Sequence, residues 1–300
     1  MAKLLDEILE ATRERVARAR RIKSFDDLDS IARDQDPGRH FEDAIRGGEI
    51  SVIAEFKRRS PSVGPIREDA DPARVAAAYE EGGAAALSVL TEPQFFSGSL
   101  ADLVAARAAC YLPVLRKDFV IDIYQVAEAR AAGADAILLI VAALPDQGLF
   151  VDLAEAAREY GLAALIEIHE APELDAAFEV EPHLIGVNQR DLRTFEVDRS
   201  LAVRLRDEIP DDVAMVAESG IRTRADVAAL EEAGVDAVLI GETLMRVPDP
   251  ALAIRELLGR PHWMGSDEFL RRTGPHQADA ALRSDLTELT PDTTDDLRPP

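Results

Sequence analysis

The sequence has a single cysteine, Cys110, among its 300 residues, so no intrachain disulfide can form. It has no apolar run near the roughly 20 residues that span a bilayer. Its first 25 residues alternate charge with apolar side chains and show no secretory cleavage site. The net charge of −23 would repel nucleic acid and anionic membranes. We therefore expect a cytoplasmic protein that binds neither.

Lysine is also scarce, because the positive charge comes from 30 arginines and only four lysines, at positions 3, 23, 57 and 117. An acidic, lysine-poor surface is typical of a high-salt cytoplasm, where carboxylates stay hydrated and their repulsion is screened. The same composition also follows from a GC-rich genome. We favour a halophilic source, and both explanations stay open.

Short apolar segments alternate with amphipathic helical patterns after residue 50. The predicted strands are residues 51–57, 85–90, 113–117, 136–141, 162–168, 183–188, 213–218 and 236–241. Eight such units predict an α/β protein with parallel strands, a (β/α)8 or TIM barrel. The alternative is an open, doubly wound sheet, but no Gly-x-Gly-x-x-Gly turn follows the first strand.

The two ends of the chain differ from this repeating pattern. Residues 1–50 contain at least one amphipathic helix, about residues 3–20, and are too few for a domain, so we expect an extension that caps the barrel of residues 51–260. Residues 261–300 gather Asp, Glu, Thr and Pro. We predict a disordered acidic tail there, with a short helix near "SDEFLRR".

Polar residues end several predicted strands, where barrels of this type place catalytic side chains. They are Glu55, Lys57, Lys117, Glu167, Asn188, Arg190, Glu218 and Ser219. Taken singly, such a residue is structural, as a solvated charge or an ion pair, about as often as it is functional. The lysines are more informative, because burial or a like charge can lower the pKa of an ammonium until it donates a proton. We predict that Lys117 is catalytic and that Lys57 is functional.

Two glycine-bearing turns, "ESGIRTRADV" and "IGETLM", follow the seventh and eighth strands, where such barrels bind phosphate through backbone N–H groups. Plain helix initiation is the structural alternative. His169 is interpreted as structural, and the five histidines show no ligand spacing for a metal. Phe96 and Phe119 either line a flat apolar pocket or pack in the core.

Together these motifs resemble the indole-3-glycerol phosphate synthase family. The matching pieces occur in order: "AEFKRRSPS", "SVLTEPQFFSGS", "PVLRKDF", "LIEIHE", "GVNQRDL", "VAESGI" and "IGETLM". The resemblance implies closure of 1-(2-carboxyphenylamino)-1-deoxyribulose 5-phosphate to indole-3-glycerol phosphate, with loss of CO2 and water. It implies a carboxy-lyase of tryptophan biosynthesis without cofactor or metal, and we expect a monomer or weak homo-oligomer.

The resemblance also implies roles for individual residues. Lys117 matches the general acid and Glu167 the second acid or base, while either Lys57 or Glu167 protonates the leaving hydroxyl. The supporting set is Glu55, Lys57, Asn188, Glu218 and Ser219. Substrate-binding residues are Ser60, Pro61, Phe96, Phe119, Leu138 and Arg190, and phosphate-binding residues are Lys57, Gly220, Gly241 and Glu242.

Two other readings compete with this one. A different phosphate-binding barrel, such as phosphoribosylanthranilate isomerase or a ribulose-phosphate epimerase, would need a Cys/Asp or His/Asp set, and Cys110 is predicted at the end of a helix. A catalytically silent barrel would bind a phosphorylated metabolite or a partner protein. Binding phosphate alone does not require two lysines and three glutamates at one mouth.

Overall fold

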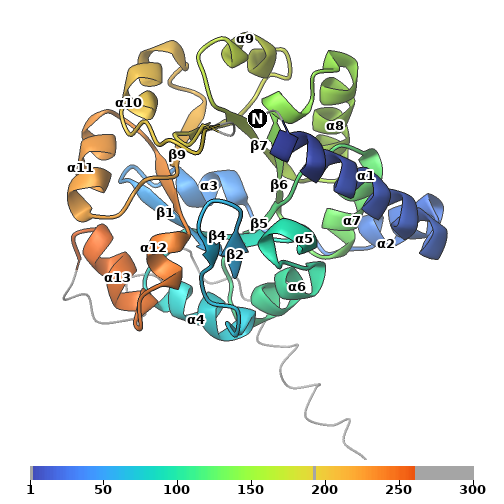
Figure 1. The fold of residues 1–300 in the computed structure, drawn as a ribbon, viewed down its shortest axis with the longest axis horizontal. Coiled ribbons are helices and arrows are strands. Elements are labelled where there is room, and N and C mark those ends of the chain that lie inside the picture. Colours follow the sequence, from blue (N-terminus) through green and yellow to red (C-terminus); the bar gives the residue numbers. More distant parts are fainter. Residues whose placement is uncertain (1–2, 192–193, 261–300) are drawn as a thin grey trace, which may run out of the picture. The chain divides into compact units, whose positions relative to one another are not determined.

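A computed structural model describes residues 3–191 and 194–260. Eight parallel strands form a closed barrel in the order β1-β10-β9-β8-β7-β6-β5-β4, surrounded by helices (Figure 1). The barrel strands are β1 (Ser51–Phe56), β4 (Ala86–Leu90), β5 (Val114–Lys117), β6 (Ala136–Ile140), β7 (Ala163–Ile168), β8 (Leu184–Asn188), β9 (Ala214–Glu218) and β10 (Ala237–Ile240). The predicted barrel is confirmed.

The helices lie between the strands and at the N-terminus. They are α1 (Lys3–Ile22), α2 (Phe25–Arg33), α3 (Phe41–Ile45), α4 (Pro72–Glu81), α5 (Pro93–Phe96), α6 (Leu100–Ala109), α7 (Ile123–Ala131), α8 (Gln147–Glu159), α9 (Glu173–Phe178), α10 (Leu201–Leu205), α11 (Arg224–Glu232), α12 (Glu242–Met245) and α13 (Pro250–Leu257). Short 3-10 turns, η1 (Val141–Ala143) and η2 (Arg206–Glu208), extend two of the loops. Among the described residues, none of the helices is long and apolar enough to cross a membrane.

The strands are apolar along most of their length because both of their faces are covered. All five residues of β6 are buried, which fits a parallel strand between a filled barrel and an outer helix layer. The seam of the barrel is the pairing of β1 with β10 on one side and with β4 on the other. This closure excludes the open, doubly wound sheet.

Helix starts are fixed by side chains that satisfy the first free N–H groups. Asp71 accepts from the N–H of Ala73 ahead of Pro72. Thr223 and Asp226 form a reciprocal capping box at the start of α11. The strand boundaries lie within two residues of those predicted from the sequence.

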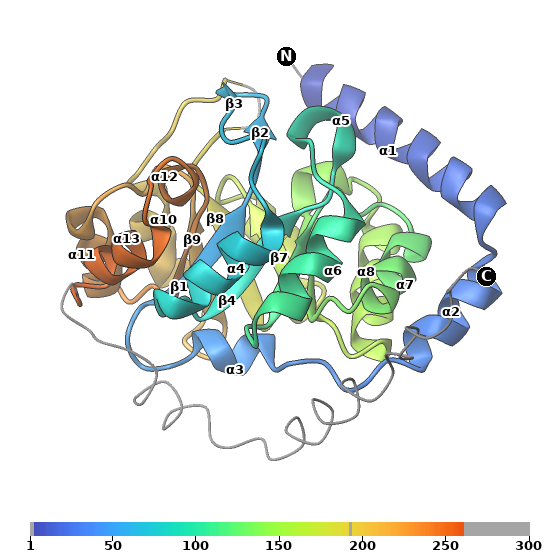
Figure 2. The ribbon, with the colours of Figure 1, turned by 90° about the horizontal axis from the view of Figure 1, so that it is seen from below.

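The N-terminal extension contains three helices where the sequence predicted at least one. In Figure 2, α1 lies at the upper end of the barrel near α5, and α3 lies at the opposite end. Both contribute to the apolar core, through Ile8 and Leu9 of α1 and through Phe41 and Ile45 of α3. The short apolar faces of α2 and α3 were missed because they span too few turns to show periodicity.

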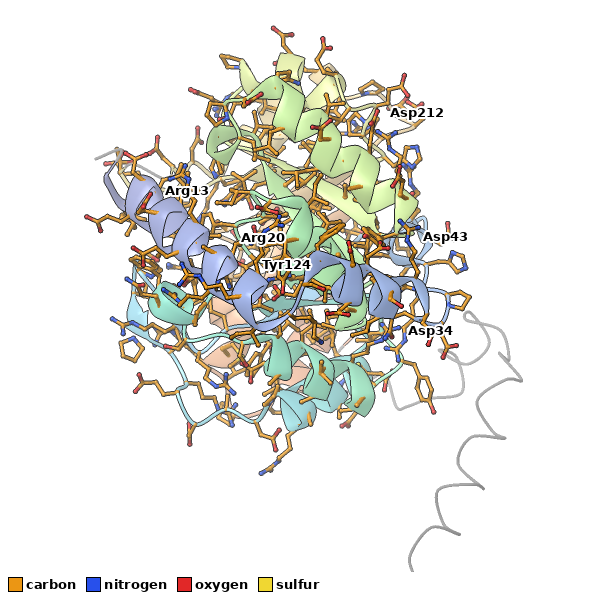
Figure 3. All side chains as sticks on the ribbon, turned by 90° about the vertical axis from the view of Figure 1, so that its right-hand side faces the viewer. Arg13, Arg20, Asp34, Asp43, Tyr124 and Asp212 are labelled. Atoms are coloured by element: carbon orange, nitrogen blue, oxygen red, sulfur yellow. The ribbon has the colours of Figure 1, made fainter. Side chains whose placement is uncertain are left out.

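The helix α1 is attached to the barrel by arginines. Arg15 donates to both carboxylate oxygens of Asp118, at 2.7 and 2.9 Å. Arg20 lies 5.2 Å from the ring centroid of Tyr124 and pairs with Asp122, and Figure 3 shows Arg20 and Tyr124 side by side. The predicted tail, residues 261–300, and its predicted helix lie outside the described residues.

Candidate active site

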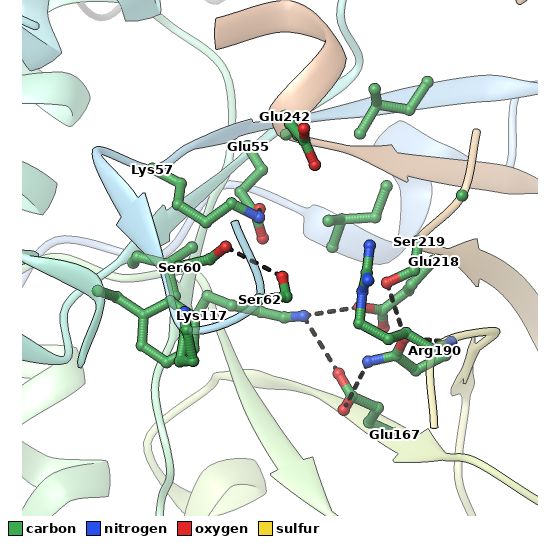
Figure 4. A pocket seen from close by; sticks show the side chains of 18 of the residues that line it. Glu55, Lys57, Ser60, Ser62, Lys117, Glu167, Arg190, Glu218, Ser219 and Glu242 are labelled. Atoms are coloured by element: carbon green, nitrogen blue, oxygen red, sulfur yellow. Dashed lines mark hydrogen bonds and ion pairs between the residues drawn. The ribbon is translucent and has the colours of Figure 1, made fainter. Parts of the chain in front are cut away.

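A cavity of about 540 Å³ opens where the barrel strands end. Every site residue predicted from the sequence lines it: Glu55, Lys57, Ser60, Pro61, Phe96, Lys117, Phe119, Leu138, Glu167, Asn188, Arg190, Glu218, Ser219, Gly220, Gly241 and Glu242. Figure 4 shows their side chains converging from strands on opposite sides of the barrel. The parallel arrangement explains this, because it places all strand ends at one mouth.

Lys117, the last residue of β5, reaches across the cavity to two carboxylates. Its Nζ lies 2.6 Å from Oε2 of Glu218 and 3.1 Å from Oε2 of Glu167 (Figure 4). All three side chains are almost fully buried. One ammonium therefore faces two carboxylates among buried side chains, where charges interact more strongly than in water.

A second ion pair lies at the end of β1, between the strands that carry Lys117 and Glu218 in the barrel order. Nζ of Lys57 is 2.5 Å from Oε1 of Glu55, two residues earlier on the same face of the chain. Glu55 occupies its position because residue 241 is glycine: a Cβ there would lie 2.2 Å from Oε1 of Glu55. The glycine after β10 thus makes room for a carboxylate of the site.

The amide of Asn188 connects β7, β8 and β9. Its Nδ2 donates to Oε1 of Glu167 at 3.2 Å, and its Oδ1 accepts from the hydroxyl of Ser219 at 2.8 Å. The same oxygen accepts from the backbone N–H of Arg190 at 3.1 Å. These contacts fix the orientation of the amide and, through it, one oxygen of Glu167.

Aromatic side chains form the apolar part of the cavity. The rings of Phe96 and Phe119 lie 6.2 Å apart between centroids, tilted by 39°. Leu138 of β6 and apolar side chains of α1, namely Leu4, Leu5 and Ile8, also line the cavity. The result is a wall suited to one flat, apolar group.

The two glycine turns differ in the N–H groups they offer. At the start of α11, Asp226 accepts from the N–H groups of Arg222 and Thr223, so capping occupies these two amides of the turn. The N-cap of α12, Gly241, has no side-chain hydrogen bond. The loop before α11 still contributes Gly220, whose φ of +78° and a contact of 2.5 Å between a built Cβ and Val197 both require glycine.

Comparison with known families decides the identity. The family model of indole-3-glycerol phosphate synthase matches residues 5–257. Indole-3-glycerol phosphate synthase 2 of Streptomyces coelicolor is 49% identical over 259 residues, covering 86% of this chain and 100% of the relative. The enzyme of Rhodopirellula baltica is 48% identical over 256 residues, covering 85% of this chain and 98% of the relative. The chain belongs to the indole-3-glycerol phosphate synthase family.

The predicted family, and with it the predicted carboxy-lyase activity in tryptophan biosynthesis, is confirmed. Solved structures of lower identity share the fold alone. A 3-hexulose-6-phosphate synthase superposes with a TM-score of 0.55 at 14% identity, covering 71% of this chain and 99% of its own. A mutant tryptophan synthase α-subunit of Pyrococcus furiosus gives 0.54 at 16% identity, covering 70% and 98%.

The protonation states of this synthase depend on the lysine between the carboxylates. Burial opposes the ammonium of Lys117, but Glu167, Glu218 and Glu55 outweigh it and raise its pKa. Burial likewise opposes the carboxylate of Glu167, yet Lys117, His169 and Asn188 lower its pKa. For Glu218, burial dominates, and repulsion from Glu167 and Glu55 adds to it, so its pKa is raised to about 7.

The pKa of Lys117 is raised, whereas the sequence analysis expected it to be lowered. A buried lysine was predicted to have a lowered pKa, but the prediction could not include carboxylates brought in from β7 and β9. In the free synthase, Lys117 is therefore a charged ammonium.

Several residues of the cavity were missed by sequence reasoning. They are Leu4, Leu5 and Ile8 of α1, Ser62 in the turn between β2 (Arg59–Ser60) and β3 (Gly64–Pro65), and Phe195, Arg222, Thr243 and Arg246 in later loops. Arg246 pairs with the carboxylate of Glu242 at 3.0 Å. Its position one turn after Glu242 was the available signal, because residues four apart meet on a helix.

Proposed function

We propose that Lys117 and Glu167 provide the acid–base chemistry of the ring closure that defines this family. The substrate is 1-(2-carboxyphenylamino)-1-deoxyribulose 5-phosphate and the product is indole-3-glycerol phosphate. The observation that supports these roles is the contact of Lys117 with Glu167 and Glu218 in a cavity that also has an apolar wall and glycine turns. An acid, a base and sites for a ring and a phosphate are the groups this reaction needs.

The first step forms the carbon–carbon bond. The ring carbon that bears the carboxylate attacks the ribulose carbonyl carbon, and the carbonyl oxygen takes a proton from the ammonium of Lys117. The carboxylate then leaves as CO2, and the electrons of the broken bond restore the aromatic ring. Glu218, whose pKa is raised to about 7, lies 2.6 Å from the amine and can return a proton to it.

The second step removes water. The hydroxyl takes a proton from Lys57, because Glu167 is ionised, and leaves. A base then removes a proton from the neighbouring carbon to form the indole. Two protons enter and one leaves, so each turnover takes up one proton. Glu167, held ionised between Lys117 and Asn188, is in position to act as this base.

Charge and shape support the placement of the substrate. Lys57 and Arg190 line the cavity and offer positive charge to the carboxylate or the phosphate. The rings of Phe96 and Phe119 offer a wall to the anthranilate ring. Gly220, Gly241 and the N–H of Glu242 offer the phosphate site, with the Glu242 carboxylate paired to Arg246.

We further propose a cytoplasmic, monomeric or weakly associating enzyme that binds neither nucleic acid nor membrane. The net charge of −23 supports the last two statements. Large exposed apolar side chains are spread from Ile22 of α1 to Leu252 of α13, without two on one element among the described residues. Scattered apolar residues of this kind do not form a broad interface.

The experiment that tests the function is direct. Purified protein is incubated with the carboxyphenylamino sugar phosphate, and indole fluorescence is followed at low and at multimolar salt. We expect product in at least one condition, together with the uptake of one proton per product. A chain that binds the substrate without forming indole at either salt would be a silent barrel.

A further inference from the structure

His169 lies directly behind Glu167, outside the lining of the cavity. It follows the last residue of β7, Ile168, and two positions separate it from Glu167, so both side chains point to the same side of the chain. Its side chain is 9% exposed. A buried imidazole next to a proposed catalytic carboxylate, but not in contact with the substrate space, can influence the reaction through that carboxylate alone.

The imidazole lies between two carboxylates. Its Nε2 is 3.2 Å from Oε1 of Glu167, and its Nδ1 is 3.7 Å from Oε2 of Glu173. Both contacts are ion pairs when the imidazole is charged. Glu173 also accepts the backbone N–H of His169 at 2.6 Å, which fixes the start of the loop.

Only the charged form of the imidazole suits both neighbours. A neutral imidazole presents an N–H at one nitrogen and a lone pair at the other, and the lone pair would face a carboxylate. Burial lowers the pKa of His169, but the contacts with Glu167 and Glu173 outweigh burial and raise it to about 10. His169 is therefore an imidazolium at neutral pH.

The two oxygens of Glu167 are held from different sides. Oε2 faces the ammonium of Lys117 inside the cavity, at 3.1 Å. Oε1 faces Asn188 at 3.2 Å and the imidazole of His169, also at 3.2 Å. When Lys117 transfers its proton to the substrate, the charge on the cavity side disappears and the charge on the outer side remains.

We propose that His169 is a positioning residue for Glu167, holding that carboxylate ionised and in one orientation during the stage in which Lys117 has given up its proton. The proposal rests on the ring-closure function proposed above and adds a residue to it. Without His169, Glu167 would lose the imidazolium that faces its Oε1, while the repulsion from Glu218 would remain. It would then take up a proton before its own step as a base.

The charged surroundings of the imidazole are defined by few elements. Glu167 faces it from β7 and Glu173 from α9. Lys117 and Glu218 lie beyond Glu167, on the cavity side. A change in the charge of His169 or Glu173 therefore reaches the reaction through Glu167.

The first test is the protonation state of His169, which does not depend on turnover. We expect a ¹⁵N NMR spectrum of the histidine-labelled full chain to show both ring nitrogens of His169 protonated at pH 8. The His169→Gln variant assigns the signal among the five histidines. One unprotonated nitrogen at pH 8 would overturn the proposal, even if the enzyme makes indole-3-glycerol phosphate normally.

The second test removes charge from the partner of His169. Glu173→Gln keeps an oxygen that accepts the backbone N–H of His169 but removes one of the two carboxylate charges. We expect the pKa of His169 to fall by about one unit. The fall of kcat at high pH should then begin about one unit lower than in the wild type. A pH profile of kcat identical to that of the wild type would contradict the role.

The third test separates positioning from substrate binding. His169→Gln should lower kcat about tenfold and change KM less than threefold, because the catalytic carboxylate loses its orientation while the cavity keeps its lining. The matched control is His183→Gln, an exposed histidine that faces Glu42 at the other end of the barrel. This control should stay within twofold of the wild type.

The outcomes of these tests are distinct. A His169→Gln enzyme with wild-type kcat would overturn the proposal, and so would a rise in KM at unchanged kcat. If this variant does not fold, the NMR signal of the wild type and the Glu173→Gln profile decide. Failure of the wild type itself to form indole would refute the proposed function, while the NMR result on His169 would stand alone.

Discussion

Asp135, at the end of the barrel where the strands begin, accepts hydrogen bonds from Arg107 at 2.5 Å and from the N–H groups of Arg39 and Val114 at 2.6 and 2.8 Å. Glu218, at the end where the strands finish, accepts one from Lys117 at 2.6 Å, and its Oε1 has no hydrogen-bond partner among the described residues. Both carboxylates are buried.

The difference between these two sites separates stability from chemistry. A buried carboxylate with several donors is stable as an anion and holds segments together. A buried carboxylate with one donor and two anionic neighbours has a raised pKa and exchanges protons near neutral pH. The same chemical group thus serves structure at one end of the barrel and lies in the proposed acid–base site at the other.

The largest effect should come from removing the ammonium at the mouth. Lys117→Met should lower kcat at least about 100-fold, because the carbonyl loses its acid. Indole fluorescence measures the rate, and thermal unfolding checks the fold. The control is Lys23→Met, at an exposed lysine at the end of α1, which should stay within twofold. A loss below about threefold in Lys117→Met would refute the role of the acid.

A change at Asp135, at the end of the barrel where the strands begin, should lower the stability of the fold and leave the reaction rate unchanged. Asp135→Asn keeps an acceptor for a backbone N–H but leaves the guanidinium of Arg107 without its anion. We expect a loss of about 2 kcal/mol in the free energy of unfolding, measured in urea, with kcat unchanged. A clear fall in kcat in a folded variant would show that the two ends are not independent.

The pH dependence of stability should identify Glu218. Its pKa is about 7 in the folded chain against an ordinary 4.5, so the folded chain binds this proton more tightly than the unfolded chain. The stabilising contribution is full below the ordinary value and is lost as the pH rises through 7. Between pH 5 and 7 the wild type should lose about 2 kcal/mol more than Glu218→Gln.

Parallel urea titrations of the wild type and Glu218→Gln at each pH measure this difference. Glu167 has a lowered pKa and contributes in the opposite sense, at lower pH, where its stabilisation is lost as the pH falls. Because Glu167 titrates below this pH range, it stays ionised between pH 5 and 7 and adds little to the difference. Equal slopes between pH 5 and 7 would contradict the raised pKa of Glu218.

The smallest effect should come from a change beside Asp118. This carboxylate lies near the mouth, but like Asp135 it accepts several hydrogen bonds, here from Arg15 and Arg116. Arg15→Met removes its pair with Asp118 and loosens α1, whose Leu4, Leu5 and Ile8 line the cavity. We expect KM to rise about threefold at constant kcat, since an apolar wall weakens but the acid remains. Arg13→Met, at a surface pair with Glu10 on the same helix, should leave KM unchanged.

Much of this molecule could be predicted because its pattern is local and repeated. All eight strands appear within two residues of their predicted bounds, and the rule that parallel strands finish at one mouth brought Lys117, Glu167 and Glu218 together. Neither inference needs knowledge of distant contacts. The halophilic source, the roles of individual residues and the tail stay predictions.

What could not be predicted depends on contacts between distant segments. The pKa of Lys117 is raised by carboxylates 50 and 101 residues away in the chain. The pairing of Arg15 with Asp118 joins residues 103 apart. His169 appeared structural because its neighbour Glu173 belongs to a helix too short to be recognised by periodicity.

The seam between β1 and β10 joins the first barrel strand to be translated with the last. Glu55 packs against Gly241 only after β1 and β10 have paired. A nascent chain halted on the ribosome before Gly241 would carry Lys57 and Lys117 yet lack part of the cavity lining. The complete pocket therefore exists only after the last barrel strand has been synthesised and has paired with the first.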